Sequence, residues 1–187
     1  TVTARISGGV AGANQVFLRH RLDGVAGFTE AVMRDDGLTG DGLAGDGVYG
    51  ARLAAQTNGT VVEFYVRATA PGNLVRTWPA PLSDGAQTAN ALLQFDDASE
   101  GALPRARVIF TAKDHRTLTA IEAQPWYLTR DAQINAPFIN TENGVADLRY
   151  GVGFRQRGAT SRDVEPPSRR VALPDDRRWH GQRMLRF

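Results

Sequence analysis

Hydrophobic and polar residues alternate with a period of two along much of the first half of the chain. In residues 15–22, Val16 and Leu18 occupy one side of an extended chain, while Arg19 and Arg21 occupy the other. An alternation of this kind, rich in β-branched and aromatic residues, predicts a half-buried β-strand.

The same alternation recurs at residues 60–69, where Val62, Phe64 and Val66 share one side. Turn signals rich in Gly, Asn and Asp separate these segments from one another. Further short strands are predicted at 2–7, 28–34, 48–54, 74–79 and 90–96. Seven short strands without a good helical stretch favour a β-sandwich over residues 1–96.

The pattern changes after residues 97–104, which are small and polar and end in proline. Such a stretch is typical of a domain linker. A helix is predicted at 112–123, because Thr111 and Asp114 have the spacing of a capping box. Strands are predicted at 106–111, 134–139, 147–157, 169–173 and 184–187, with Asn143-Gly144 forming a hairpin turn. Residues 105–187 are thus expected to form a smaller α+β module, incomplete because the chain stops on a beginning strand.

Arginines and glycines alternate within the predicted strand at 147–157. The alternation places Arg149, Arg155 and Arg157 on one face, with Gly151 and Gly153 between them. Glycine within a strand lets another group approach the sheet closely. That group is either another part of the chain or a ligand.

Charge is distributed unevenly along the chain, although the formal net charge is only +2. Residues 149–187 hold ten arginines and four acids, a net charge of +6, whereas the remainder carries −4. Arginine forks bind phosphate and carboxylate oxygens in a bidentate manner. The basic segment therefore predicts an anion- or nucleotide-binding surface with the candidates Arg155, Arg157, Arg162, Arg169 and Arg170. The alternative is internal neutralisation by Asp147, Asp163 and Glu165.

A pentapeptide beginning with Asp-Gly is repeated three times in residues 36–50. Several carboxylates on a tightly turning loop favour a hard cation, and calcium is the candidate cofactor. The metal-ligand candidates are Asp35, Asp36, Asp41 and Asp46. Their spacing differs from that of the EF-hand, whose ligands come at every second position. The alternative is an Asx-turn loop, in which each aspartate caps its own backbone.

Composition excludes several classes of protein. The chain has 42% hydrophobic residues, which is ordinary for a globular protein, and its lack of cysteine excludes disulfides, Cys-ligated zinc and thiol nucleophiles. No window approaches the eighteen consecutive apolar residues of a membrane-spanning helix. No P-loop, GxGxxG or HExxH motif is present. Few aromatic residues accompany the basic segment, which argues against nucleic acid as a partner.

Several segments of the second module together resemble the opening part of CotH-type domains, the spore-coat-related atypical kinases. The most specific segment is 149–162, which reads RYGVGFRQRGATSR. The other matching segments are 138–139, 170–174, 179–181 and 184–185. The first module, through residues 33–37 and 45–49, resembles the immunoglobulin- or fibronectin-like domain that often precedes a CotH-type domain. The expected fold is therefore mainly β, with an N-terminal immunoglobulin-like β-sandwich before the smaller α+β module.

The resemblance implies a secreted bacterial protein, located outside the cell or on its surface. The family binds ATP with a divalent metal such as magnesium and transfers phosphate to protein. In this chain the strand at 168–171 carries arginine where the family usually has lysine, and the family's acidic metal ligands are expected beyond residue 187. No catalytic residue is therefore assigned.

Three functional hypotheses follow, two from the resemblance and one from the frequent use of β-sandwiches for sugar binding. The first is a non-catalytic structural or protein-interaction fragment, with a protein partner, self-association or the remaining part of the CotH-like domain as its contact. The second is one part of an ATP-dependent kinase whose catalytic lobe is absent from this chain. The third is a carbohydrate- or surface-adhesion module, for which Trp78 is a candidate sugar-stacking side chain. The start at Thr1 also leads us to expect a processed or excised chain.

Overall fold

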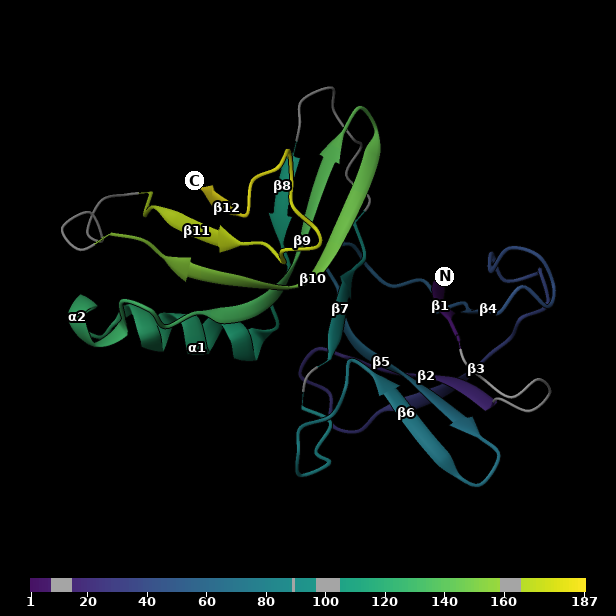
Figure 1. The fold of residues 1–187 in the computed structure, drawn as a ribbon. Coiled ribbons are helices and arrows are strands. Elements are labelled where there is room, and N and C mark those ends of the chain that lie inside the picture. Colours follow the sequence, from purple (N-terminus) through teal and green to yellow (C-terminus); the bar gives the residue numbers. More distant parts are fainter. Residues whose placement is uncertain (8–14, 89, 97–104, 159–165) are drawn as a thin grey trace. The chain divides into compact units, whose positions relative to one another are not determined.

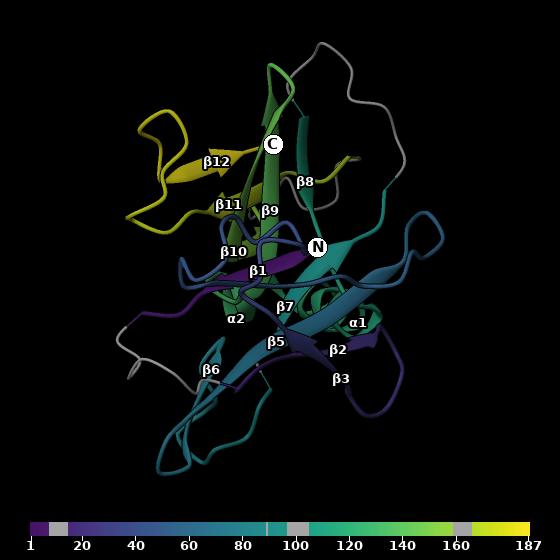
Figure 2. The same cartoon turned by 90° about the vertical axis from the view of Figure 1, so that its right-hand side faces the viewer.

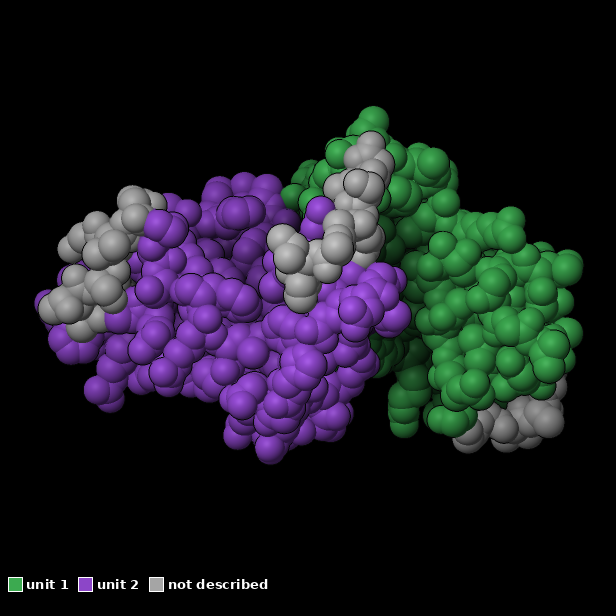
Figure 3. Space-filling view, turned by 90° about the horizontal axis from the view of Figure 1, so that it is seen from above, with its two compact units in different colours: residues 1–96 green, residues 97–187 purple. Residues whose placement is uncertain are grey.

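The computed structural model describes residues 1–7, 15–88, 90–96, 105–158 and 166–187. It is mainly β, with 46% strand and 9% helix, which confirms the predicted fold class. The chain forms two compact units, residues 1–96 and residues 97–187, coloured separately in Figure 3. The predicted linker at 97–104 lies outside the described residues, as do Arg162 and two of its predicted internal partners, Asp163 and Glu165.

The described part of unit 1 consists of seven strands and their connections (Figure 1). Each strand overlaps a strand predicted from the alternation, and the ends differ by a few residues. The strands are β1 (Val2–Arg5), β2 (Gln15–Leu22), β3 (Thr29–Met33), β4 (Val48–Ala51), β5 (Val61–Ala70), β6 (Leu74–Trp78) and β7 (Ala91–Gln94).

The larger sheet of unit 1 has the antiparallel order β3-β2-β5-β6, and β7 also pairs with β5. Strands β1 and β4 form a separate antiparallel pair. In the larger sheet Leu18 lies opposite Val66, so the apolar sides of β2 and β5 coincide. Val16, Leu18, Val62 and Phe64 are buried, as the alternation predicts. The hydrophobic side of this sheet therefore forms the core of unit 1.

The described part of unit 2 contains one antiparallel sheet and two helices (Figure 2). The strand order is β12-β11-β10-β9-β8, so β8 and β12 are the edges. The strands are β8 (Arg105–Val108), β9 (Ile134–Glu142), β10 (Val145–Gln156), β11 (Arg169–Ala172) and β12 (Met184–Arg186), and the helices are α1 (Ala112–Glu122) and α2 (Trp126–Thr129).

Helix α1 begins at the predicted capping box. The Thr111 hydroxyl accepts the Asp114 backbone N–H at 3.0 Å, and the Asp114 carboxylate accepts the Thr111 backbone N–H at 3.0 Å. These two bonds satisfy donors that a helix start otherwise leaves unpaired. Leu118 then packs from α1 into the core of unit 2. One side of the sheet is therefore its core side, and the opposite side is called here the outer face.

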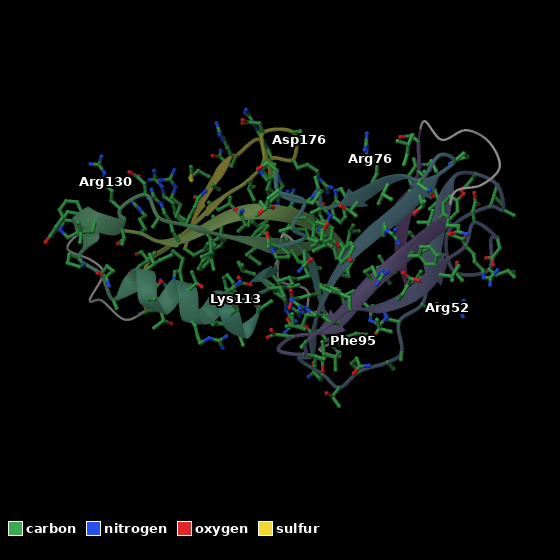
Figure 4. The ribbon with its side chains drawn as sticks, turned by 90° about the horizontal axis from the view of Figure 1, so that it is seen from below. Arg52, Arg76, Phe95, Lys113, Arg130 and Asp176 are labelled. Carbon is green, nitrogen blue, oxygen red and sulfur yellow. The ribbon has the colours of Figure 1, made fainter. Side chains whose placement is uncertain are left out.

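The core side of the sheet gathers Phe138, Val152, Phe154 and Val171, all buried. Trp179, from the loop between β11 and β12, packs on Phe138 with a ring-centroid distance of 5.9 Å. This loop, residues 174–183, thus covers the part of the core that surrounds Phe138 of β9. Figure 4 labels Asp176 in this loop and Lys113, the sole lysine of the sequence, on α1.

Strand β10 contains a β-bulge that the alternation does not reveal. Arg149 lies opposite Phe138 and Val152 lies opposite Ala136, so β10 has one residue more than β9 between these pairs. Gly151 lies in this stretch with φ +69°, a left-handed conformation that glycine adopts without a steric cost. The extra residue reverses the phase of the alternation. Arg149 therefore shares the core side with Val152.

The prediction that Arg149 lies on one face with Arg155 and Arg157 is wrong for this reason. Arg149 is only 4% exposed. Arg155, beyond the bulge, points to the outer face because its neighbour Phe154 is buried in the core. One strand thus directs arginines to opposite sides of the same sheet.

Candidate anion-binding face and acidic loop

Three arginines lie in a row across neighbouring strands on the outer face of unit 2. In the strand register, Arg155 of β10 is directly opposite Arg170 of β11, and Arg170 is directly opposite Arg186 of β12. Residues directly opposite one another project from the same face of a sheet. We call these three residues the arginine row.

Arg157 extends the row by a fourth positive charge. Its backbone N–H donates to the Ser168 carbonyl at 2.9 Å, which continues the pairing of β10 with β11 beyond Gln156. Since side chains alternate along a strand, Arg157 projects to the same face as Arg155. Arg157 and Arg186 are both exposed.

Negative charge near the row is scarce among the described residues. Asp131 approaches the Arg155 guanidinium at 3.3 Å, and the Asp131 side chain is 78% exposed. No carboxylate of the described part of the chain pairs with Arg157, Arg170 or Arg186 within salt-bridge distance. The Arg170 guanidinium instead contacts the Met184 sulfur.

Electrostatics at the centre of the row reflect this imbalance. Burial lowers the pKa of the Arg170 guanidinium, and the positive charges of Arg155 and Arg186 lower that pKa further. Asp131 acts in the opposite direction, and Arg157 adds another lowering contribution. The positive charges of the row therefore destabilise one another in the absence of a further anion.

The positions beside the row are small or aliphatic. Gly153, Ala172 and Met184 lie opposite one another in the neighbouring row. The side chain of Gln133 lies over Gly153, since a Cβ built at that glycine would come within 2.5 Å of the Gln133 amide oxygen. The sequence left open whether a ligand or another part of the chain approaches the strand glycines. At Gly153, another part of the chain, Gln133, lies against the glycine.

The structure separates the predicted anion-binding candidates. Arg155, Arg157 and Arg170 lie together on the outer face. Arg169 lies on the core side, where it pairs with Glu122 of α1 and its guanidinium lies 6.0 Å from the centre of the Phe154 ring. Adjacent residues of a strand point to opposite faces of the sheet. Arg169 and Arg170 therefore cannot contact the same ligand on one face.

Arg186 was missing from the sequence-based set, although its position offered a signal. The predicted strand at 184–187 alternates Met184, Leu185 and Arg186, and Leu185 packs against the core. The alternation therefore places Arg186 on the outer face. The sequence does not reveal that β12 pairs with β11 in the register that aligns Arg186 with Arg170.

Buried Arg149 has a structural role distinct from the row. Its Nε–H donates to the Arg177 carbonyl at 2.7 Å, and its terminal nitrogens donate to the Asn140 side-chain oxygen and to the Arg178 carbonyl. The same guanidinium pairs with Asp147 at 2.7 Å. Arg149 therefore fastens the loop 174–183 to strands β9 and β10.

The Glu142 carboxylate provides a second attachment for this loop. It accepts hydrogen bonds from the Trp179 indole N–H at 3.2 Å and from the His180 imidazole at 3.0 Å. The His180 hydrogen bond, followed by that of Trp179, lowers the pKa of Glu142. The Glu142 carboxylate thus holds the loop through the neighbouring side chains of Trp179 and His180.

The four candidate metal ligands of unit 1 all accept backbone hydrogen bonds within their own loop. Asp36 and Asp46 each accept the N–H two residues further on, at 2.9 Å, as Asx turns do. Asp35 accepts the N–H groups of Gly45 and Gly47 at 2.7 and 2.9 Å. The bonds of Asp36 and Asp46 are those of the Asx-turn alternative, whereas Asp35 accepts N–H groups ten and twelve residues further along the chain.

Asp41 is the most enclosed of the four, with only 2% of its surface exposed. One carboxylate oxygen accepts the backbone N–H groups of Asp36 and Gly37, and the other accepts the N–H and hydroxyl of Thr39, each at 2.9 Å. These bonds, above all that from Gly37, hold the pKa of Asp41 far below its usual range. Asp41 therefore organises the loop as a charged hydrogen-bond acceptor.

We expect Asp41→Asn to lower the melting temperature of unit 1, because an amide removes the charge and directs N–H donors at backbone donors. A lowered pKa contributes stability above the unfolded-state value of about 4, and this contribution is lost as the pH falls. The melting temperature of wild type should therefore fall as the pH is lowered below about 4, and the variant should show a smaller pH dependence. Asp84→Asn, which changes one exposed Asx acceptor, is the control; an equal effect of both substitutions would contradict the role of Asp41.

Calcium binding by the acidic loop stays a prediction. Among the described residues, the aspartates do not form a cluster of three ligands with metal-binding geometry. A calcium site formed only in the folded state would raise the melting temperature as calcium is added. An identical melting temperature in excess calcium and in excess chelator would contradict it.

Comparison with known proteins supports the assignment of unit 1. Residues 22–77 match the family model described as the second Ig-like domain of conditioned medium factor. No match was found among curated proteins or among solved structures. The match lies within the strands of unit 1, so the chain contains an Ig-like module. In the described part of the chain, no helix has the length and apolar character needed to cross a membrane.

Proposed function

We propose that this chain is a non-catalytic interaction fragment of a secreted or cell-surface bacterial protein. It combines an Ig-like module with the N-terminal part of a CotH-like domain. The match of residues 22–77 to an Ig-like domain carries the proposal, because Ig-like sandwiches are common in cell-surface proteins. The resemblance of residues 149–162 to CotH-type domains supports the second part.

The contact surface proposed for this role is the outer face of unit 2. The arginine row has more positive charge than the described residues neutralise. An uncompensated basic surface attracts anionic partners and accelerates their association. The partner is therefore an anionic surface, on another protein, on the remaining part of the CotH-like domain or on a surface polymer.

Two measurements test this proposal. An antibody against unit 1 should label intact source cells or detect the protein in the culture medium. Incubation of the purified chain with labelled ATP, magnesium and a protein substrate should give no phosphate transfer. A cytosolic location, or phosphate transfer by the chain alone, would overturn the proposal.

The alternative function is a nucleotide-binding part of a CotH-like kinase. The arginine row favours it, because arginine forks bind phosphate oxygens. Titration with ATP, with and without magnesium, separates the two functions. Saturable binding that is lost in Arg155→Ala and Arg157→Ala would favour the kinase, whereas no binding at millimolar ATP would remove its support.

A further inference from the structure

The arginine row is an arrangement that folding alone does not favour. Like charges directly opposite one another in a sheet are destabilising, and the row contains two such pairs in succession. Among the described residues, Asp131 is the carboxylate that reaches the row, and it reaches Arg155 at one end. The Arg170 guanidinium lies between two arginines and contacts the thioether sulfur of Met184, which is only a weak acceptor. An external anion would remove this repulsion.

The dimensions of the row indicate an extended anion. Neighbouring strands lie about 4.8 Å apart, so the backbone positions of Arg155 and Arg186 are separated by about 10 Å. Arg157 lies about 7 Å from Arg155 along the strand. One small anion contacts one or two guanidinium groups and leaves the others uncompensated. A chain with regularly repeated anionic groups neutralises all four.

The surface beside the row distinguishes between kinds of polyanion. Single-stranded nucleic acids are held by basic grooves combined with aromatic side chains on which the bases stack. The residues directly beside the row on β10, β11 and β12 are Gly153, Ala172 and Met184, and they offer no such platform. The amide of Gln133, over Gly153, supplies hydrogen bonds suited to hydroxyl groups instead.

From these observations we infer that Arg155, Arg157, Arg170 and Arg186 form a binding site for a sulfated polysaccharide. The site lies on the outer face of unit 2, and the polymer runs across strands β10, β11 and β12. This inference rests on the proposed function as an interaction fragment and names the partner class. Binding is dominated by ion pairing and is therefore sensitive to salt.

The experiment measures binding of dextran sulfate to the full chain by isothermal titration calorimetry, with uncharged dextran as the control polymer. The triple variant Arg155→Gln, Arg170→Gln, Arg186→Gln should bind about a hundredfold more weakly, since each arginine near an anionic surface contributes about 1 kcal/mol. The matched control is Arg177→Gln, Arg178→Gln, Arg183→Gln, which removes three charges from the loop 174–183. The control should change the affinity by only a few fold.

Two further variants distinguish a loss of binding from a loss of folding. Arg170→Gln should leave the melting temperature unchanged or raised, because it removes repulsion, and yet it should weaken binding about fivefold. Arg170→Lys retains the charge and should retain most of the affinity. A fourfold rise in salt should weaken wild-type binding by at least tenfold. The triple variant should lose most of this salt dependence.

Equal losses in the row variant and the control variant would overturn the site, as would tight binding of uncharged dextran. Displacement of dextran sulfate by oligo(dT) at equal charge concentration, with the same dependence on the row, would overturn the polysaccharide in favour of nucleic acid. Anionic vesicles that bind through the row better than dextran sulfate would overturn it in favour of a membrane. A cytosolic location with intact binding would contradict the proposed function alone.

Discussion

Phe138→Ala is expected to lower the free energy of unfolding of unit 2 by about 4 kcal/mol. Phe138 has no exposed surface and lies in the centre of the core between β10 and the loop 174–183. Truncation removes its buried surface and leaves a cavity beneath Trp179, which packs on the ring. Urea unfolding, followed by circular dichroism and by tryptophan fluorescence, measures the change.

Phe187→Ala is the matched control for this substitution, because the Phe187 side chain is 57% exposed. It removes the same atoms and should change the free energy of unfolding by less than about 1 kcal/mol. Similar losses in the two variants would show that Phe138 is not the centre of this core.

Arg149→Met is expected to cost about 3 kcal/mol, because methionine fills much of the volume but donates no hydrogen bond. The substitution leaves the buried Asn140 side chain and the carbonyls of Arg177 and Arg178 without their guanidinium donor. The loop 174–183 should then detach before the rest of the unit unfolds. Hydrogen exchange of the loop amides, together with urea unfolding, measures both effects.

Arg177→Met provides an informative comparison, because Arg177 pairs with the same carboxylate, that of Asp147, from an exposed position. An exposed pair of this kind contributes no more than about 1 kcal/mol. If both substitutions had the same cost, the stabilisation would come from the charge of Asp147. A difference of about 2 kcal/mol would assign it to the buried hydrogen bonds of Arg149.

Local patterns predicted the regular elements well. The alternation of Val62, Phe64 and Val66 with polar residues identified β5 and its buried side, and this prediction is confirmed. The spacing of Thr111 and Asp114 identified the start of α1 in the same way. Both signals depend on residues a few positions apart, where backbone geometry alone fixes which side chains meet.

The candidate site depended on information that the sequence carries only weakly. The alternation of β10 side chains between the two faces shifts by one residue at Gly151. A single glycine in a strand sequence does not distinguish such a bulge from a regular position. The alternation therefore misplaced Arg149. The alignment of Arg170 with Arg186 depends on the register of strands joined by a long loop, which no local pattern specifies.

The acidic loop presented a different difficulty. A carboxylate that binds a cation and one that accepts backbone N–H groups require the same residue type and the same glycine-rich turns. The repeat therefore left two alternatives open. The positions of Gly45 and Gly47 relative to Asp35 arise only when the loop closes over ten or more residues.

Because of the bulge, β10 tolerates neither the loss nor the gain of a residue between Arg149 and Val152. Deleting Gly151 would restore a regular alternation, and every residue on one side of the deletion would exchange faces with its neighbours. Val152 and Phe154 would then leave the core, or Arg149 would leave the loop that it holds. The single extra residue thus allows one continuous strand to bury an arginine near one end and display arginines near the other, and a change of one residue between them disrupts one of the two arrangements.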